Sequence, residues 1–316
     1  MKILNLIENT EGAAGCAAEH GLSFYIETED HRLLMDLGPS ASVVANAEKL
    51  GADLKTVDTV ILSHGHYDHG GGILPFTKLN PEAKIYLQES AFGEYYSIRD
   101  HGPEYIGLDP AIRELPQVVT VNGEYRIDEE LFLFSGIRGK KNWPVSNYNL
   151  RKKEGGELLQ DDFIHEQCLV ITEGERRILL SGCAHNGILN ILDRFEEVCG
   201  GAPDIVISGF HMMKKSGYTD EERQVIRDTA RKLKKYPTVF YTCHCTGIKA
   251  FDMMKKIMGE KLQYVHCGER IPADVTAEML EERVRRKKDY MKWHKFFAWG
   301  TVFCFIATMI TGYKKR

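Results

Sequence analysis

One short stretch constrains this chain of 316 residues more than any other, and its sequence is LSHGHYDHGGG at positions 62–72. Three histidines and one aspartate lie there within six residues, directly after the largely apolar run 57–62. Such a run is typical of a buried strand, and the glycines allow a sharp turn behind it. Neutral imidazoles and carboxylates are ligands that Zn²⁺ and similar metals bind. The stretch therefore predicts a metal site at a sheet edge rather than a solvated histidine-rich loop.

The four ligand-type side chains cannot all face the same way. His64 and His66 share one face, because side chains alternate along a strand. Asp68 and His69 come after the strand has ended, so they can turn toward a second metal. The motif is therefore compatible with one cation or with two.

The pattern His-x-His-x-Asp-His after a strand resembles the signature of the metallo-β-lactamase superfamily. Five other segments resemble one branch of it, which is named for the methanopterin-pathway ribofuranosylaminobenzene 5'-phosphate synthase. These segments are GLS at 21–23, MDLG at 35–38, SGCAHNG at 181–187, GFH at 209–211 and TCHCTG at 242–247. The resemblance implies an α/β fold over residues 1–271, the four-layer αββα sandwich of two mixed sheets covered by helices.

The resemblance also implies the ligands of two divalent cations. His64, His66 and His185 would bind the first cation. Asp68, His69 and His244 would bind the second. Asp68 would also have a catalytic role, because it would orient the hydroxide that forms when neighbouring cations lower the pKa of a shared water. Zn is the metal we expect, and Mn and Fe suit the same ligands.

Further residues are expected around the metals. Asp36 resembles a residue that orients a ligand histidine, although it also fits an ordinary turn-capping role. Superfamily members usually have a bridging aspartate where this chain has Cys183, so this thiol is either a ligand or, as we favour, a buried structural cysteine. His211 is expected to donate to the substrate or a developing oxyanion, or else to bond backbone in a loop. His165 and Glu166 are reserve candidates for a ligand.

The composition fits a globular enzyme rather than a nucleic-acid-binding protein. Hydrophobic residues make up 43% of the chain, charged residues 27%, and the formal net charge is −4. No basic track of the kind that binds a phosphate backbone is visible. The eight cysteines are scattered without disulfide spacing, and no signal-peptide pattern follows Met1. We therefore expect reduced thiols in a cytosolic compartment.

Two long segments with little periodicity, 91–115 and 136–162, are expected near the substrate. The first either shapes the pocket or is a surface excursion. The second contains clustered basic residues, among them Lys152 and Lys153. These side chains either hold an anionic group of the substrate or form a solvated charge run.

The C-terminal part departs from the globular pattern. Residues 272–295 predict a basic amphipathic helix or linker, and the eighteen uncharged residues 296–313 predict a transmembrane helix. The larger basic cluster precedes this span, which predicts a single-pass C-terminal anchor with the catalytic domain on the cytoplasmic side. The alternatives are a last core helix and a helix that lies flat on a membrane.

These features together predict a metal-dependent hydrolase that activates water to cleave a small, anionic ester, lactone or phosphoester. The resembling branch suggests a second function, a synthase-type transfer of a phosphoribosyl or pterin-type compound. A third is a non-catalytic, membrane-tethered metal-binding module. The expected partners are a small-molecule substrate and, through the C-terminal helix, a membrane, without nucleic acid; the oligomeric state is open.

Overall fold

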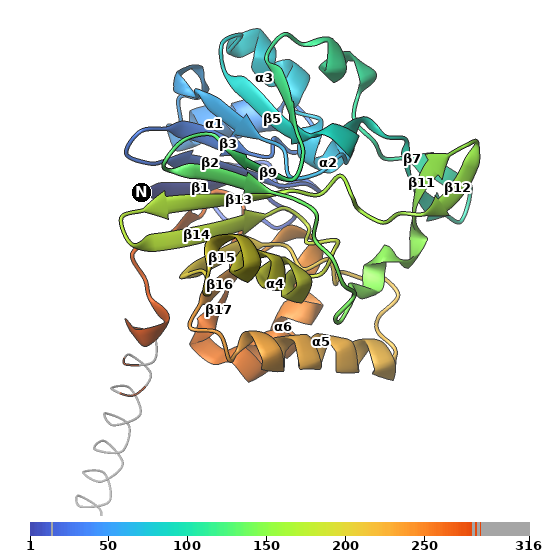
Figure 1. Cartoon of the computed structure of the whole chain (residues 1–316), viewed down its shortest axis with the longest axis vertical. Coiled ribbons are helices and arrows are strands. Elements are labelled where there is room, and N and C mark those ends of the chain that lie inside the picture. Colours follow the sequence, from blue (N-terminus) through green and yellow to red (C-terminus); the bar gives the residue numbers. More distant parts are fainter. Residues whose placement is uncertain (14, 280–281, 283–284, 286–316) are drawn as a thin grey trace, which may run out of the picture.

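Two mixed sheets packed face to face form the body of the molecule in the computed structural model, which describes residues 1–13, 15–279, 282 and 285 (Figure 1). In spatial order, the first sheet consists of β18 (Arg270–Ile271), β1 (Lys2–Ile7), β2 (Ser23–Glu27), β3 (Arg32–Met35), β4 (Thr59–Ile61), β5 (Lys84–Gln88) and β8 (Val118–Val121). The second consists of β17 (Leu262–Tyr264), β16 (Val239–Thr242), β15 (Ile205–Ser208), β14 (Arg176–Ser181), β13 (Cys168–Glu173), β10 (Leu131–Phe134) and β9 (Glu124–Arg126).

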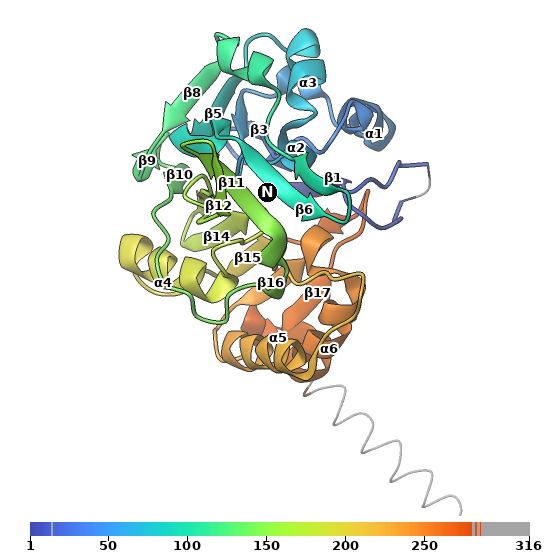
Figure 2. The same cartoon turned by 90° about the vertical axis from the view of Figure 1, so that its right-hand side faces the viewer.

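Helices cover the outer face of each sheet and complete four layers (Figure 2). The first sheet is covered by α1 (Ser42–Leu50) and α3 (Ile73–Leu79), and the second by α4 (Ile188–Cys199), α5 (Asp220–Leu233) and α6 (Ile248–Met258). The connections contain the short helices α2 (Tyr67–Gly70), η1 (Leu54–Thr56), η2 (Glu89–Phe92), η3 (Pro110–Glu114), η4 (Val145–Asn149), η5 (His244–Thr246) and η6 (Gly259–Lys261). The predicted αββα sandwich is thus confirmed.

The sandwich forms because both faces of its central strands are apolar. In β3, Leu33 and Met35 lie in the core between the sheets, whereas Leu34 lies in the core beneath the helices. The run Ile178–Leu180 in β14 alternates in the same way between the two cores of the second sheet. Since side chains alternate along a strand, a continuous apolar run is what a sheet covered on both sides requires.

A third sheet stands at one end of the sandwich and is built from the two segments expected near the substrate. Its order is β12 (Glu157–Gln160), β11 (Leu150–Glu154), β6 (Tyr95–Arg99) and β7 (Gly102–Tyr105). It lies at the right of Figure 1 and faces the viewer in Figure 2. The segments 91–115 and 136–162 are therefore partly paired strands, which the sequence conceals because short hairpins have little apolar periodicity.

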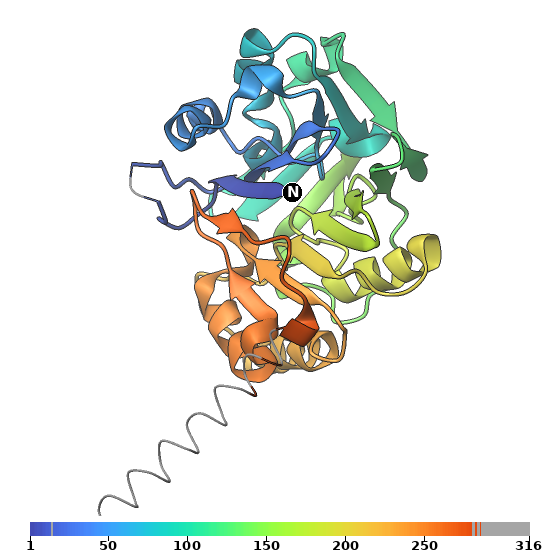
Figure 3. The ribbon, with the colours of Figure 1, turned by 90° about the vertical axis from the view of Figure 1, so that its left-hand side faces the viewer.

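The first and last strands of the described sandwich are neighbours at one edge of the first sheet. β1 pairs with β18 in antiparallel fashion, with Ile3 opposite Ile271 (Figure 3, blue and orange-red). The residues that follow β1 therefore lie close to the last strand of the described chain.

The expected membrane anchor requires correction. No helix among the described residues is long and apolar enough to cross a membrane. The longest of them, α5, has 14 residues, or about 21 Å of helix against about 30 Å of hydrocarbon core. The predicted span, 296–313, lies outside the described residues. Given this finding, the predictions of a transmembrane helix and of a membrane location do not stand.

Candidate metal centre

The ends of parallel strands bring the predicted site residues together. β3 and β4 are parallel neighbours in the first sheet, and β14, β15 and β16 are parallel neighbours in the second. Asp36 follows β3 and the segment 64–69 follows β4, while Cys183, His211 and His244 follow β14, β15 and β16. Because parallel strands end at a common sheet edge, these residues from distant parts of the chain meet at one place.

The backbone is strained at several of these strand ends. Asp36, Ala184, His211 and His244 all have positive φ, at 59°, 54°, 46° and 48°. This left-handed region is unfavourable for residues other than glycine and persists only where surrounding structure enforces it. Its repeated use around one centre indicates that side-chain direction is fixed here at a cost in backbone energy.

The first predicted cation site contains two imidazoles whose bare nitrogens face each other. The Nε2 atoms of His64 and His185 are 3.2 Å apart. His185 Nδ1 donates to Asn147 Oδ1 at 3.1 Å, and His64 Nδ1 lies 2.9 Å from Ser63 Oγ. Since Ser63 Oγ itself donates to Asp36, it accepts from His64. Both Nε2 atoms therefore present lone pairs to the same space, which a cation would stabilise.

His66 completes this group. Its ring centroid is 4.5 Å from that of His64 and 4.9 Å from that of His185. Its Nε2 is buried without a hydrogen-bond partner among the described residues. A buried polar atom of this kind calls for a partner, and the donor set around it fits a borderline metal ion.

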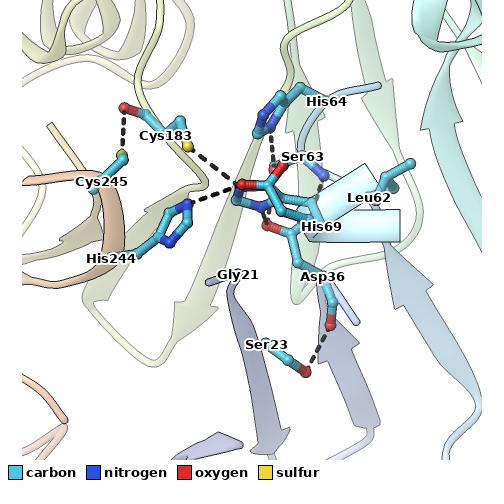
Figure 4. Close-up of polar contacts among 12 residues, drawn as sticks. Gly21, Ser23, Asp36, Leu62, Ser63, His64, His69, Cys183, His244 and Cys245 are labelled. Atoms are coloured by element: carbon cyan, nitrogen blue, oxygen red, sulfur yellow. Dashed lines mark hydrogen bonds and ion pairs between the residues drawn. The ribbon is translucent and has the colours of Figure 1, made fainter. Parts of the chain in front are cut away.

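Asp36 lies beneath the histidines and links two of them (Figure 4). Its Oδ1 accepts from the Ser63 backbone N–H at 2.7 Å. Its Oδ2 accepts from Ser63 Oγ at 2.8 Å and from His69 Nδ1 at 2.7 Å. With Nδ1 used in this way, His69 turns its Nε2 toward the centre, which is the arrangement of a carboxylate that supports a ligand histidine.

The second predicted cation site gathers Asp68, His69 and His244. Asp68 Oδ2 is 3.4 Å from His244 Nε2 and 3.8 Å from His69 Nε2. His244 Nδ1 donates to Asn9 Oδ1 at 2.8 Å, which leaves its Nε2 as the ring nitrogen that faces the centre. Two donors about 2.05 Å from one tetrahedral ion lie about 3.3 Å apart, and the Asp68–His244 distance is close to that value.

Burial and mutual repulsion set the charges of the centre. Burial, followed by the neighbouring histidines, holds the pKa of His64 and of His185 well below the usual range. Burial and His165 lower the pKa of His66 to about 3. Burial also lowers the pKa of His69, but the nearby carboxylates of Asp36 and Asp68 outweigh this effect and raise the pKa to about 9. The centre thus combines three imidazoles that are neutral at pH 7, those of His64, His66 and His185, with carboxylates. His69 would have to release its proton to bind a divalent cation.

Cys183 lies between the two predicted sites. Its Sγ is 3.2 Å from His69 Nε2. It forms one compact donor group with His64 and His185 and another with His69 and His244, each with all atoms within 4.8 Å. The sequence left a structural and a metal-ligand role open for this thiol, with the structural one favoured, and its position among imidazoles is compatible with the metal-ligand alternative.

His211 and Cys245 form the inner wall beside Cys183. His211 has both ring nitrogens buried without a hydrogen-bond partner in the described part of the chain. Its ring centroid is 4.1 Å from that of His185, and its backbone N–H donates to Cys245 Sγ at 3.3 Å. A ring N–H of His211 is therefore available to a bound molecule, and its donation to a substrate stays a prediction.

The two reserve candidates support the backbone instead. His165 Nδ1 accepts from the Gly65 N–H at 3.0 Å, and its Nε2 donates to Asp161 at 3.2 Å. Both of its nitrogens are therefore occupied. Glu166 Oε1 accepts from the His185 N–H at 2.6 Å. These contacts position ligand loops from behind, and a single sequence contains no periodic signal for them.

A pocket of about 600 Å³ opens onto the centre. The centre contributes His66, Asp68, Cys183, His185, His211, His244 and Cys245 to its lining, and the third sheet contributes Ser97–His101. The segment 91–115 thus shapes the pocket. Lys152 and Lys153 do not line it and pair with Asp162 and Glu94. The positive charges in the lining come from Arg99, Lys214 and Lys215, and Asp68 and Asp100 contribute negative ones.

The comparisons with known proteins agree with this geometry. Residues 17–145 match the family model described as the metallo-beta-lactamase superfamily. The chain is 30% identical to the 7,8-dihydropterin-6-methyl-4-(beta-D-ribofuranosyl)-aminobenzene-5'-phosphate synthase of Methanocaldococcus jannaschii, over 86% of this chain and 96% of the relative. The chain therefore belongs to the metallo-β-lactamase superfamily, in the branch that contains this synthase.

Two other relatives are informative. The chain is 27% identical to an uncharacterized protein of the same organism, MJ0448, over 80% of this chain and 93% of the relative. Among solved structures, Tm1679, described as a metal-dependent hydrolase of the beta-lactamase superfamily, superimposes with a TM-score of 0.72 at 29% identity. That match covers 86% of this chain and 99% of Tm1679.

Proposed function

We propose that this protein is a metal-dependent hydrolase of a small, anionic ester, lactone or phosphoester. The observation that carries the proposal is the pair of facing Nε2 atoms of His64 and His185, 3.2 Å apart and each left with a lone pair by a hydrogen bond at Nδ1. Such a contact is repulsive unless a cation lies between the nitrogens. The printed description of Tm1679 as a metal-dependent hydrolase supports the same reaction class.

His64, His66 and His185 would hold one divalent cation, and Asp68, His69 and His244 a second. Bound cations would supply Lewis-acid chemistry and a water of lowered pKa. The chain's own residues orient the reactants: Asp68 faces the pocket and directs the attacking water, and His211 donates to the oxygen that gains charge. The imidazoles of His64, His66 and His185 are buried, which strengthens the interactions among these groups.

Lys215 supports the choice of an anionic substrate, because it lines the pocket and forms no ion pair with a described residue. Lys215→Glu should raise KM several-fold for an anionic substrate and leave KM for a neutral ester unchanged. Lys153→Glu is the matched control, since Lys153 pairs with Glu94 and lies outside the pocket lining. Equal effects of both substitutions would refute the anionic subsite.

A panel of esters, lactones and phosphodiesters, assayed with Zn²⁺, Mn²⁺ or a chelator, tests the reaction itself. We expect cation-dependent hydrolysis that chelation abolishes and metal addition restores. A metal-loaded protein without turnover on the whole panel would instead favour a binding module.

A synthase-type transfer is the second candidate, because the relative that is 30% identical and matched over 96% of its length is a named synthase. Incubation with a phosphoribosyl donor and an aromatic acceptor separates the two functions. A joined product would favour the transferase, whereas hydrolysis without joining would favour the hydrolase.

A further inference from the structure

His20 extends into the metal centre from a part of the chain that none of the expected ligands comes from. It lies in the connection between β1 and β2, just before Gly21. Its Nε2 is 3.5 Å from Asp68 Oδ2, and its ring centroid is 5.0 Å from that of His244. Its side chain is 51% exposed and lines the pocket, so it is open to solvent on one side and to the centre on the other.

The position of His20 is fixed by the backbone that follows it. The Leu22 N–H donates to the Asp68 carbonyl at 3.2 Å, and the Gly21 N–H donates to Asn9 Oδ1 at 3.2 Å. A Cβ on Gly21 would lie 2.5 Å from the Asp68 carbonyl oxygen and 2.5 Å from Pro39. Only glycine allows this approach, and the approach brings His20 against the metal-binding turn.

The same asparagine ties His20 to another ligand. Asn9 Oδ1, which holds the Gly21 N–H, also accepts from His244 Nδ1 at 2.8 Å. Asn9 therefore positions both the backbone directly after His20 and the ring of His244, and the two rings lie side by side with centroids 5.0 Å apart.

The distances fit shared coordination. His20, Asp68 and His244 form a compact group with all donor atoms within 4.8 Å. The separations from Asp68 Oδ2 are 3.5 Å to His20 Nε2 and 3.4 Å to His244 Nε2. Ligands about 2.05 Å from one tetrahedral ion are about 3.3 Å apart, so both imidazoles stand where co-ligands of one cation stand.

We infer that His20 is a further protein ligand of the second cation, which it binds together with Asp68 and His244. This inference rests on the proposed function only for the existence of a second cation. The resemblance assigns no role to His20, and the position offers an imidazole to a borderline ion such as Zn²⁺ or Co²⁺. Its half-exposed side chain can also leave the cation, which would open a coordination position to a substrate.

Titration of the metal-free protein with Co²⁺ tests the inference, with equilibrium dialysis and visible absorption as readouts. We expect the wild type to bind two equivalents. His20→Ala should lower the affinity for the second Co²⁺ by about 10-fold or more and alter the d–d bands of that ion, without change to the first. His101→Gln is the matched control, because His101 lines the same pocket but belongs to none of the compact donor groups within the described ranges.

His20→Gln separates ligation from hydrogen bonding. A glutamine amide can still donate to Asp68 but is a poor metal ligand, so we expect His20→Gln to behave as His20→Ala does. Wild-type affinity and spectrum in His20→Gln would show that His20 only positions Asp68, and would overturn the inference. Unchanged binding in both variants would overturn it too. No bound Co²⁺ in the wild type would instead refute the proposed metal function.

Discussion

The two sheets contribute to the metal centre in different ways. The first sheet supplies its candidate ligands from a single turn, residues 64–69, which the carboxylate of Asp36 supports through hydrogen bonds. The second sheet supplies Cys183, His185 and His244 from separate strand ends. There, buried carboxylates hold the backbone rather than the rings: Glu166 accepts from the His185 N–H and Glu8 from the His244 N–H, each at 2.6 Å. The side chains of residues 64–69 are therefore held within one turn, whereas His185 and His244 depend on carboxylates from other parts of the chain.

The largest expected effect is loss of a ligand from the contiguous turn. His66→Ala should remove cation binding at the first site and lower kcat/KM by at least about 100-fold, because it deletes the buried Nε2 that has no hydrogen-bond partner among the described residues. Metal analysis and kinetics on the same preparation measure both. Full activity with normal metal content would break the assignment of this turn.

Replacement of the brace comes next. Asp36→Asn keeps the volume of the side chain but cannot accept all three hydrogen bonds from Ser63 and His69. We expect cation affinity to fall about 10- to 100-fold. Competition with a chromophoric chelator measures this affinity. Asp162→Asn, at an exposed partner of Lys152, is the control that should leave affinity unchanged.

The carboxylate anchors of the second sheet should act separately. In Glu166→Gln, the amide NH₂ would face one of the N–H donors of His185 and Asn186, at a cost of about 1–3 kcal/mol of folding stability. Glu8→Gln should cause a similar loss near His244. We expect Glu166→Gln to weaken binding of the first cation and Glu8→Gln to weaken binding of the second. If both variants weakened the same cation, the two anchors would not belong to separate sites.

The smallest expected effect is on folding stability, and it concerns a contact between the first and the second sheet. His31, in the turn between β2 and β3, lies 2.7 Å from Asp58 and 2.7 Å from Asp128, which precedes β10. Burial lowers the pKa of His31, but the two aspartates outweigh it and raise the pKa. The contact therefore stabilises the fold fully below the unfolded-state pKa of about 6.5, and this stability is lost as pH rises through the raised folded value.

Denaturant unfolding of His31→Gln measures this contribution. The partners are exposed to solvent, so we expect a loss of under about 1 kcal/mol at pH 6. The difference from wild type should shrink at pH 9. A difference that grew with pH would contradict the assigned direction.

The sequence alone points to the contiguous half, and it needs the resemblance for the dispersed half. The four candidate ligands of residues 64–69 are recognisable because they all lie in one turn after β4, although β4 ends at Ile61 and so does not include His64 and His66 as the alternation argument assumed. His185 and His244 were located through resemblance, since only the parallel order of β14, β15 and β16 brings them to the same edge. His20 lacked a motif of its own, because its role depends on the close contact of Gly21 with the Asp68 backbone.

Two other positions depended on neighbours that the sequence does not show. Lys152 and Lys153 were compatible with an anion site or with a solvated charge run, and their ion pairs with Asp162 and Glu94 agree with the charge run. Cys183 was favoured as a packing residue because most buried cysteines are, yet its neighbours are His69, His64 and His185. Composition identifies which residues are available for chemistry, and three-dimensional neighbours decide which of them take part.

The pairing of β1 with β18 has a consequence for the order of assembly. Glu8 and Asn9 follow β1 directly, and both hold His244. During synthesis, Glu8 and Asn9 can form their hydrogen bonds with His244 only after nearly the whole domain has been made. Cation binding at the second site should therefore stabilise the pairing of β1 with β18 late in folding. Removal of the cation should make the backbone amide hydrogens of β1 and β18 exchange with solvent sooner than those of β3 or β14.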